Sequence, residues 1–205
     1  EPHGRGGLKA AYPSGPAPPM NAAATREHGG GLGAAMAAYG GARGDWLDLS
    51  TGINPEPYPP GTLPDHAWSA LPDAAAMARL LAAARRFWRV PDGAEVVAAP
   101  GASALIAKLP LLPAAPGAYI PGPTYNEHQA AFAAHGNVTS ADDAGLPTHV
   151  YVHPNNPDGR LWPSRAIGGR GGITIVDESF CDVAPEDSHI AQSTKPGVII
   201  HKRVG

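Results

Sequence analysis

The feature that most constrains this chain is a pair of short apolar runs that each end abruptly in polar residues. Residues 150–152 (Val-Tyr-Val) lead into His-Pro-Asn-Asn-Pro-Asp-Gly at 153–159, and residues 173–176 (Ile-Thr-Ile-Val) lead into Asp-Glu-Ser-Phe at 177–180. Runs rich in β-branched residues and bounded by turn formers are typical of buried strands. Polar residues therefore lie at the ends of two strands. In an open α/β sheet, ligands bind at this edge.

Helical segments separate the apolar runs along the chain. The clearest helix is expected over residues 73–89, where apolar side chains recur at three- and four-residue spacing and indicate a face turned to the core. Shorter helices are expected over 104–112 and 126–135. Further strands are expected at residues 96–99, 118–120 and 198–200. Strands alternating with helices indicate right-handed crossovers and a mostly parallel sheet flanked by helices, so the fold class is α/β.

Composition narrows the function class to small-molecule chemistry. The formal net charge is -3 over 205 residues, so there is no broad basic surface for nucleic acid or an anionic membrane. No apolar run approaches the roughly 20 residues that span a bilayer, so neither a membrane span nor an export signal is expected. The single cysteine, Cys181, forms no internal disulfide and has no metal-ligand spacing, so no metal is expected. A reducing, cytoplasmic setting is the simplest inference.

The N-terminal part lacks a hydrophobic period. Residues 1–24, rich in Gly and Pro, are expected to be a disordered extension, residues 25–60 an N-terminal arm, and residues 61–205 a partial large domain. Gly29, Gly31 and Ala34 match the G-x-G-x-x-A dinucleotide pattern, but no strand precedes them, so the pattern lacks its structural context.

Several ordered motifs at strand ends resemble those of the pyridoxal-phosphate (PLP) enzymes of fold type I, the aminotransferase superfamily. Within it, the chain most resembles the threonine-phosphate decarboxylases of cobalamin biosynthesis, over residues 26–200. The motifs are Pro-Gly-Ala-Ser at 100–103, Pro-Thr-Tyr at 123–125, Pro-Asn-Asn-Pro-Asp-Gly at 154–159 and Asp-Glu-Ser-Phe at 177–180, with His-Gly-Gly-Gly at 28–31, residues 50–55 and residues 177–182 favouring the decarboxylases.

The resemblance implies a role for each motif, although each taken alone is also an ordinary turn, cap or core residue. The helix start at Gly101, Ala102 and Ser103 would bind the cofactor phosphate through amides and a hydroxyl. Asp177 would pair with the pyridine nitrogen, and Asn156 would hydrogen-bond the phenolic oxygen.

Further assignments concern the cofactor ring, the substrate and the neighbouring polar residues. Tyr125 would stack on the ring. His28, Gly29 and Asn54 would recognise the substrate, unless this segment is an arm that crosses a dimer partner. Cys181 is expected to be a buried apolar residue. Structural roles are expected for His153, Glu178 and Asp182, and surface positions for His128 and His135.

The implied reaction is the decarboxylation of L-threonine O-3-phosphate to (R)-1-aminopropan-2-ol phosphate by a full-length homodimer. The alternatives are a histidinol-phosphate-type aminotransferase and a non-catalytic, truncated remnant. The family's Schiff-base lysine is expected just after Gly205, and the small C-terminal domain would follow it. Lys202 falls early for that role and is predicted not to fill it. The link from Gly159 to Ile173 leaves little room for a crossover helix.

Overall fold

The computed structural model describes residues 29–52, 54, 56–112, 116–143, 145–167 and 171–204. The chain divides into two compact units, Glu1–Ala67 and Trp68–Gly205. The expected extension at residues 1–24 lies outside the described residues. No helix in the described part is both long enough and apolar enough to span a bilayer.

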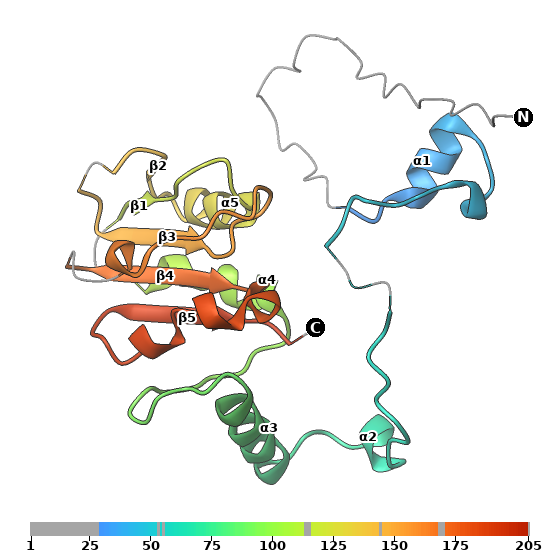
Figure 1. Cartoon of the computed structure of the whole chain (residues 1–205), viewed down its shortest axis with the longest axis horizontal. Helices are drawn as coiled ribbons and strands as arrows, with labels where there is room; N and C mark the ends of the chain where they lie inside the picture. Colours follow the sequence, from blue (N-terminus) through green and yellow to red (C-terminus); the bar gives the residue numbers. More distant parts are fainter. Residues whose placement is uncertain are drawn as a thin grey trace, which may run out of the picture. The chain divides into compact units, whose positions relative to one another are not determined.

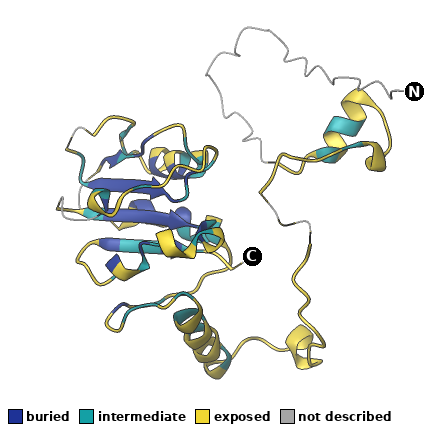
Figure 2. Cartoon of the chain, viewed as in Figure 1, coloured by how far each residue is buried: buried dark blue, intermediate teal, exposed yellow. Residues whose placement is uncertain are grey.

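A five-stranded sheet forms the centre of the second unit (Figure 1). Every pairing is parallel, in the order β2-β1-β3-β4-β5, which confirms the expected α/β class. The strands are β1 Ala118–Tyr119, β2 Thr139–Ser140, β3 Thr148–Val152, β4 Ile173–Glu178 and β5 Val198–Lys202. Strands β3 and β4 are buried along nearly their whole length because layers cover both faces (Figure 2).

Two hydrophobic clusters lie on opposite faces of this sheet. On the face that we call the helical face, α4 Ala102–Ile106, the 3-10 turn η2 Leu109–Leu111 and α5 Asn126–Ala134 pack against strand residues. The cluster there includes Ile106, Phe132, Val150 and Ile175. The expected helix over 104–112 is thus two shorter pieces, with Pro110 inside the second.

The other face, which we call the loop face, is covered by short 3-10 turns and their connecting loops. Its cluster contains Tyr151, Ile167, Val176 and Val198, with Trp162 packed against it. The link from β3 to β4 holds only η3 Ser164–Ala166 among its described residues, in agreement with the limited room for a crossover helix. The β4 to β5 link holds η4 Cys181–Val183, η5 Pro185–Asp187 and η6 Ile190–Gln192.

The longest helix is α3 Ala74–Phe87, close to the range expected from its spacing. The Asp73 side chain caps it by accepting a hydrogen bond from the Ala76 amide at 2.6 Å. The expectation that its apolar stripe faces the core is wrong within the described residues, because no residue of α3 is buried and Phe87 is 71% exposed (Figure 2). The Trp88 indole, just after the helix, donates to Asp182 Oδ1 at 2.9 Å.

The strand expected at residues 96–99 does not form. This segment has no regular secondary structure, and Val97 is 84% exposed. A strand needs a neighbour for its backbone groups, and the described sheet ends at β5, which pairs with β4 alone. Apolar composition therefore predicted a strand for which the described chain supplies no partner.

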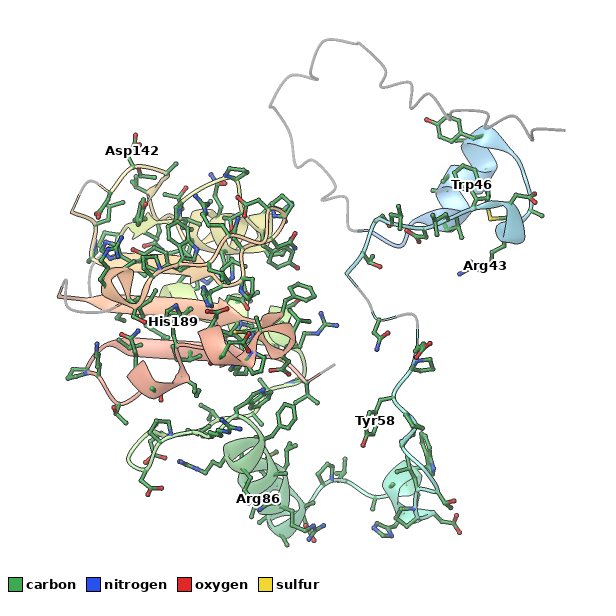
Figure 3. The ribbon with its side chains drawn as sticks, in the orientation of Figure 1. Arg43, Trp46, Tyr58, Arg86, Asp142 and His189 are labelled. Carbon is green, nitrogen blue, oxygen red and sulfur yellow. The ribbon has the colours of Figure 1, made fainter. Side chains whose placement is uncertain are left out.

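The first unit contains α1 Leu32–Tyr39 and the turn η1 Arg43–Asp45, and α2 His66–Ser69 straddles its end. Trp46, labelled in Figure 3, donates from its indole to the Gly40 carbonyl at 3.2 Å. A Cβ on Gly29 would lie 2.0 Å from the Ser50 carbonyl oxygen, so this close approach requires glycine. Since α1 follows no described strand, the dinucleotide pattern lacks its βαβ context.

Candidate functional site

The candidate site is centred on Asp177, near the carboxyl end of β4 and only 2% exposed. His128 Nε2 lies 2.7 Å from Oδ2 of this carboxylate. Oδ1 accepts hydrogen bonds from the Ser179 amide at 3.0 Å and the Ser179 hydroxyl at 2.6 Å. His201 Nδ1 lies 3.4 Å from the same oxygen. Two imidazoles and a turn therefore surround one buried carboxylate.

The surroundings of Asp177 determine its ionisation state. Burial alone would raise the pKa of this carboxyl, because a low-dielectric surrounding disfavours the anion. The hydrogen bond with His128 and the nearby imidazole of His201 outweigh burial and hold the pKa of Asp177 well below its usual range. The site thus presents a fixed negative charge, which suits a protonated ring nitrogen.

His128 was expected on the surface, and this expectation is wrong. The side chain is fully buried in α5, while His135 at the end of the same helix is exposed as expected. The buried residues of α5 are His128, Ala131 and Phe132, which are three and four positions apart and share one face of the helix. Helical spacing alone could have placed His128 inside.

The proposed phosphate-binding turn opens α4. Gly101 is the residue before the helix and has a φ of 88°, a conformation that favours glycine. Nothing lies within 4 Å of the position that a Cβ would occupy there. Ala102 packs against the helical-face cluster, and Ser103 is exposed. The first amides of α4 and the Ser103 hydroxyl thus border open space.

Tyr125 and Asn156 stand on loops after neighbouring strands. Tyr125 directly precedes α5, and its ring meets the His128 ring edge-on at a centroid distance of 6.2 Å. Asn156 is half-buried after β3, beside the fully bonded Asn155. Strands β1, β3 and β4 are adjacent and parallel, so their carboxyl ends bring Tyr125, Asn156 and Asp177 to one edge.

Asn155 links the two loops. Its Oδ1 accepts from the Thr124 hydroxyl at 2.6 Å, and its Nδ2 donates to the Pro123 carbonyl at 3.0 Å and to Asp158 Oδ1 at 2.7 Å. The residue is 3% exposed. The loop that carries Tyr125 is thereby tied to the loop that carries Asn156, although sequence reasoning assigned Asn155 no role.

Lys202 lies on the wrong face for a cofactor held by Asp177. It is paired in register with Glu178 across β4 and β5, whereas His201 is paired with Asp177. Successive residues of a strand point to opposite faces, so Glu178 and Lys202 share the loop face. The Lys202 ammonium contacts Glu178 Oε2 at 2.5 Å and donates to the Ser188 hydroxyl at 3.2 Å.

The loop face also holds a buried group with metal-ligand chemistry. His153, Glu178 and Cys181 each bring one possible ligand atom within 4.8 Å of the others. Both His153 ring nitrogens already have partners, in the Asp187 carbonyl at 2.9 Å and the Trp162 amide at 3.0 Å. The Lys202 ammonium already neutralises Glu178. These contacts favour a structural role, as expected for His153 and Glu178.

Burial shifts the pKa of one member of this group, Cys181, and of a neighbouring residue, His189. Burial raises the pKa of the Cys181 thiol to about 11, and Glu178 adds to the effect. Cys181 is fully buried, as expected. His189, labelled in Figure 3, donates its amide to Glu178 and has its pKa lowered, mainly by burial and then by His153.

The proposed substrate residues belong to the other unit. His28 lies outside the described residues. Asn54 Oδ1 accepts a hydrogen bond from the Glu56 amide at 3.0 Å in a local turn, and the Gly30 amide, next to Gly29, donates to the Ser50 hydroxyl at 2.7 Å. These contacts define the local shape of the segment. Its role in substrate binding stays a prediction.

A hollow of about 220 Å³ opens beside the carboxyl ends of β1 and β2. Its lining includes Thr124, Tyr125, Gln129 and Ser140, but neither Asp177 nor Asn156. This hollow therefore borders the candidate site only at Tyr125.

The sequence is similar to curated threonine-phosphate decarboxylases. It is 40% identical to that of a Sinorhizobium species over 189 residues, which cover 84% of this chain and 56% of the relative. It is 36% identical to that of Pseudomonas aeruginosa over 196 residues, which cover 87% and 57%. The chain is related to threonine-phosphate decarboxylases. It spans a little over half the length of these relatives, and no family model matches it.

Solved structures support the fold. Histidinol-phosphate aminotransferase from Clostridium acetobutylicum matches with a TM-score of 0.55 at 21% identity, over 65% of this chain and 46% of that one. L-threonine-O-3-phosphate decarboxylase from Porphyromonas gingivalis matches with a TM-score of 0.50 at 17% identity, over 60% and 44%. The chain therefore shares its fold with part of each of these two proteins, in agreement with the expected α/β class.

Proposed function

We propose that the whole protein decarboxylates L-threonine O-3-phosphate to (R)-1-aminopropan-2-ol phosphate with PLP, in cobalamin biosynthesis. The observation that carries the proposal is Asp177, a buried carboxylate kept ionised at the ligand edge of a parallel sheet, in a chain related to threonine-phosphate decarboxylases. The proposal includes assembly into a homodimer and a cytoplasmic location, which rest on the resemblance and on the single cysteine.

The residues of the described chain fit PLP. Among the described residues, Oδ2 of Asp177 is bonded to His128 alone, and a carboxylate oxygen accepts at least two donors, so Oδ2 has room for the pyridine N–H. The uncovered start of α4 at Gly101, Ala102 and Ser103 suits the phosphate, because free amides and the helix dipole favour an anion. Asn156 would donate to the phenolic oxygen, and Tyr125 would pack on the ring.

The chemistry divides between the cofactor and the protein. PLP, when bound, accepts into its ring the electron pair that carbon dioxide leaves at the substrate α-carbon. Asp177 supports this by keeping the ring nitrogen protonated, and His128 keeps Asp177 charged and oriented. Asn156 and Tyr125 orient the ring. His28, Gly29 and Asn54 would bind the substrate, and the lysine that moves the proton would follow Gly205.

The main alternative is a histidinol-phosphate-type aminotransferase, because such an enzyme has the same fold by structural comparison. The two reactions use the same cofactor residues and differ in the bond broken at the α-carbon. A second alternative is a remnant that folds and binds cofactor without catalysis. Product analysis separates all three.

A chimera tests the proposal. Residues 29–204 of this chain would replace the matching segment of the Pseudomonas aeruginosa threonine-phosphate decarboxylase, which supplies the remainder of the enzyme. With PLP, the chimera should release carbon dioxide from threonine phosphate. Asp177→Asn should lower the rate by about a hundredfold or more, and Asp92→Asn, at an exposed turn, should leave it unchanged. Transamination of histidinol phosphate instead, or PLP binding without either product, would overturn the proposal.

A further inference from the structure

His201 is a buried side chain that the proposed reaction does not use. It is 4% exposed, and among the described residues neither of its ring nitrogens makes a hydrogen bond. A buried imidazole without partners is unfavourable, so its presence calls for an explanation. Its Nδ1 lies 3.4 Å from Oδ1 of Asp177.

The backbone places these two side chains together. Asp177 of β4 and His201 of β5 are partners in the parallel register, so their side chains share the helical face. His128 approaches the other carboxylate oxygen from α5. The carboxylate is thus approached by a helix on one side and by the neighbouring strand on the other.

The contact needs only a small movement to become a hydrogen bond. The Nδ1 to Oδ1 distance exceeds the usual 2.7–3.2 Å range by a few tenths of an ångström. Within the described sheet, β5 pairs with β4 alone and has no strand on its other side. A slight closure of β5 or a rotation of the ring would complete the bond.

We propose that His201 is a positioning residue for Asp177, donating from Nδ1 to Oδ1 while His128 holds Oδ2. Oδ1 is then held by Ser179 and His201 and Oδ2 by His128, so the open acceptor position for the incoming ligand lies on Oδ2. The effect on ligand binding rests on the proposed function, because the ligand is a protonated ring nitrogen. The contact between His201 and Asp177 does not depend on the proposed function.

The first test needs no ligand. Nitrogen-15 NMR of the histidine rings in the full chain reports which nitrogen carries hydrogen. The proposal expects a protonated Nδ1 on His201 whose signal moves when Asp177→Asn is introduced. An unprotonated Nδ1, or a signal that does not move in Asp177→Asn, would overturn the proposed contact independently of any result on enzyme activity.

The second test uses pyridoxamine 5'-phosphate, which carries the ring and phosphate but needs no lysine. His201→Leu removes the donor, His201→Asn keeps a nitrogen close to the Nδ1 position, and His201→Gln places one close to Nε2. The His201→Leu and His201→Gln variants should bind pyridoxamine 5'-phosphate about tenfold more weakly than the wild type, the effect expected for one hydrogen bond to a charged group. The His201→Asn variant should keep most of the wild-type affinity.

The matched control is His149→Leu. His149 is also a buried strand histidine, 3.3 Å from a carboxylate oxygen of Asp143, but it stacks with Tyr151 on the loop face. This variant should bind pyridoxamine 5'-phosphate like the wild type. Rescue by Gln in place of Asn would overturn the Nδ1 assignment. Failure of the wild type to bind, with the NMR result intact, would reject the proposed function and leave the histidine contact standing.

Discussion

Asp177 and Glu178 are consecutive residues of β4, and their carboxylates lie on opposite faces of the sheet. Asp177 meets His128 and His201 on the helical face, and Glu178 meets Lys202 on the loop face. Strand alternation enforces this separation. Asp177 thus supplies a charge for the ligand and has imidazole partners, whereas Glu178 forms a structural ion pair with Lys202.

The position of Lys202 leads to a first prediction. When the chain is mixed with PLP and reduced with borohydride, peptide mapping should find no adduct at Lys202. Its side chain is 8% exposed and held by Glu178 on the face opposite Asp177. Lys108, which is exposed, is the internal comparison and should be labelled more. A dominant adduct at Lys202 would contradict the assignment of faces.

The low pKa of Asp177 leads to a second prediction, on acid stability. A carboxyl whose pKa is lower in the folded state contributes stability above its unfolded pKa, near 3.9, and loses it as the pH falls towards the folded value. Asp177→Asn should therefore be less stable than wild type at pH 6, and the difference should shrink below about pH 4.

Urea unfolding measured from pH 6 to pH 3 checks this dependence. Asp92→Asn is the control, because Asp92 is an exposed carboxylate in a turn away from Asp177. That variant should follow the wild-type curve closely. A constant difference between Asp177→Asn and wild type across the range would show that the charge is not what stabilises the fold.

The strands that sequence predicted correctly were those whose neighbours are also in the described chain. Residues 150–152 and 173–176 lie inside β3 and β4, and both are paired on two sides. Residues 96–99 have the same apolar character but no described partner, and residues 97–99 are exposed. Apolar composition reports the tendency to form a strand, while pairing depends on distant residues.

The candidate site was predictable in part for a similar reason. Asp177 and Asn156 could be placed because they follow recognisable strands. The burial of His128 was not predicted, because a histidine in a helix was expected at the surface. Its spacing to Ala131 and Phe132 nevertheless indicates a shared buried face. The His201 contact with Asp177 depends on the β4 to β5 register, which no local pattern reveals.

The environment of Cys181 leads to a third prediction, on thiol reactivity. The thiol is fully buried and its pKa is raised to about 11, so little thiolate is present at pH 8. Labelling by iodoacetamide should be slow in the folded chain and fast in urea. A Ser103→Cys, Cys181→Ala variant moves the single thiol to an exposed position and should react quickly when folded. Equal rates in both folded proteins would refute the buried assignment.

The bonds of Asn155 lead to the last prediction. Asn155→Ala removes three side-chain hydrogen bonds and leaves the Pro123 carbonyl and the Thr124 hydroxyl without this partner. We expect a loss of about 2 to 4 kcal/mol in the free energy of unfolding. Thr124→Val removes one of these bonds and should cost less. In the Asn155→Ala background, Thr124→Val should cost little more, because the bond it breaks is already gone. Additive losses would mean that the two loops are not coupled through this contact, and that Tyr125 and Asn156 are positioned independently.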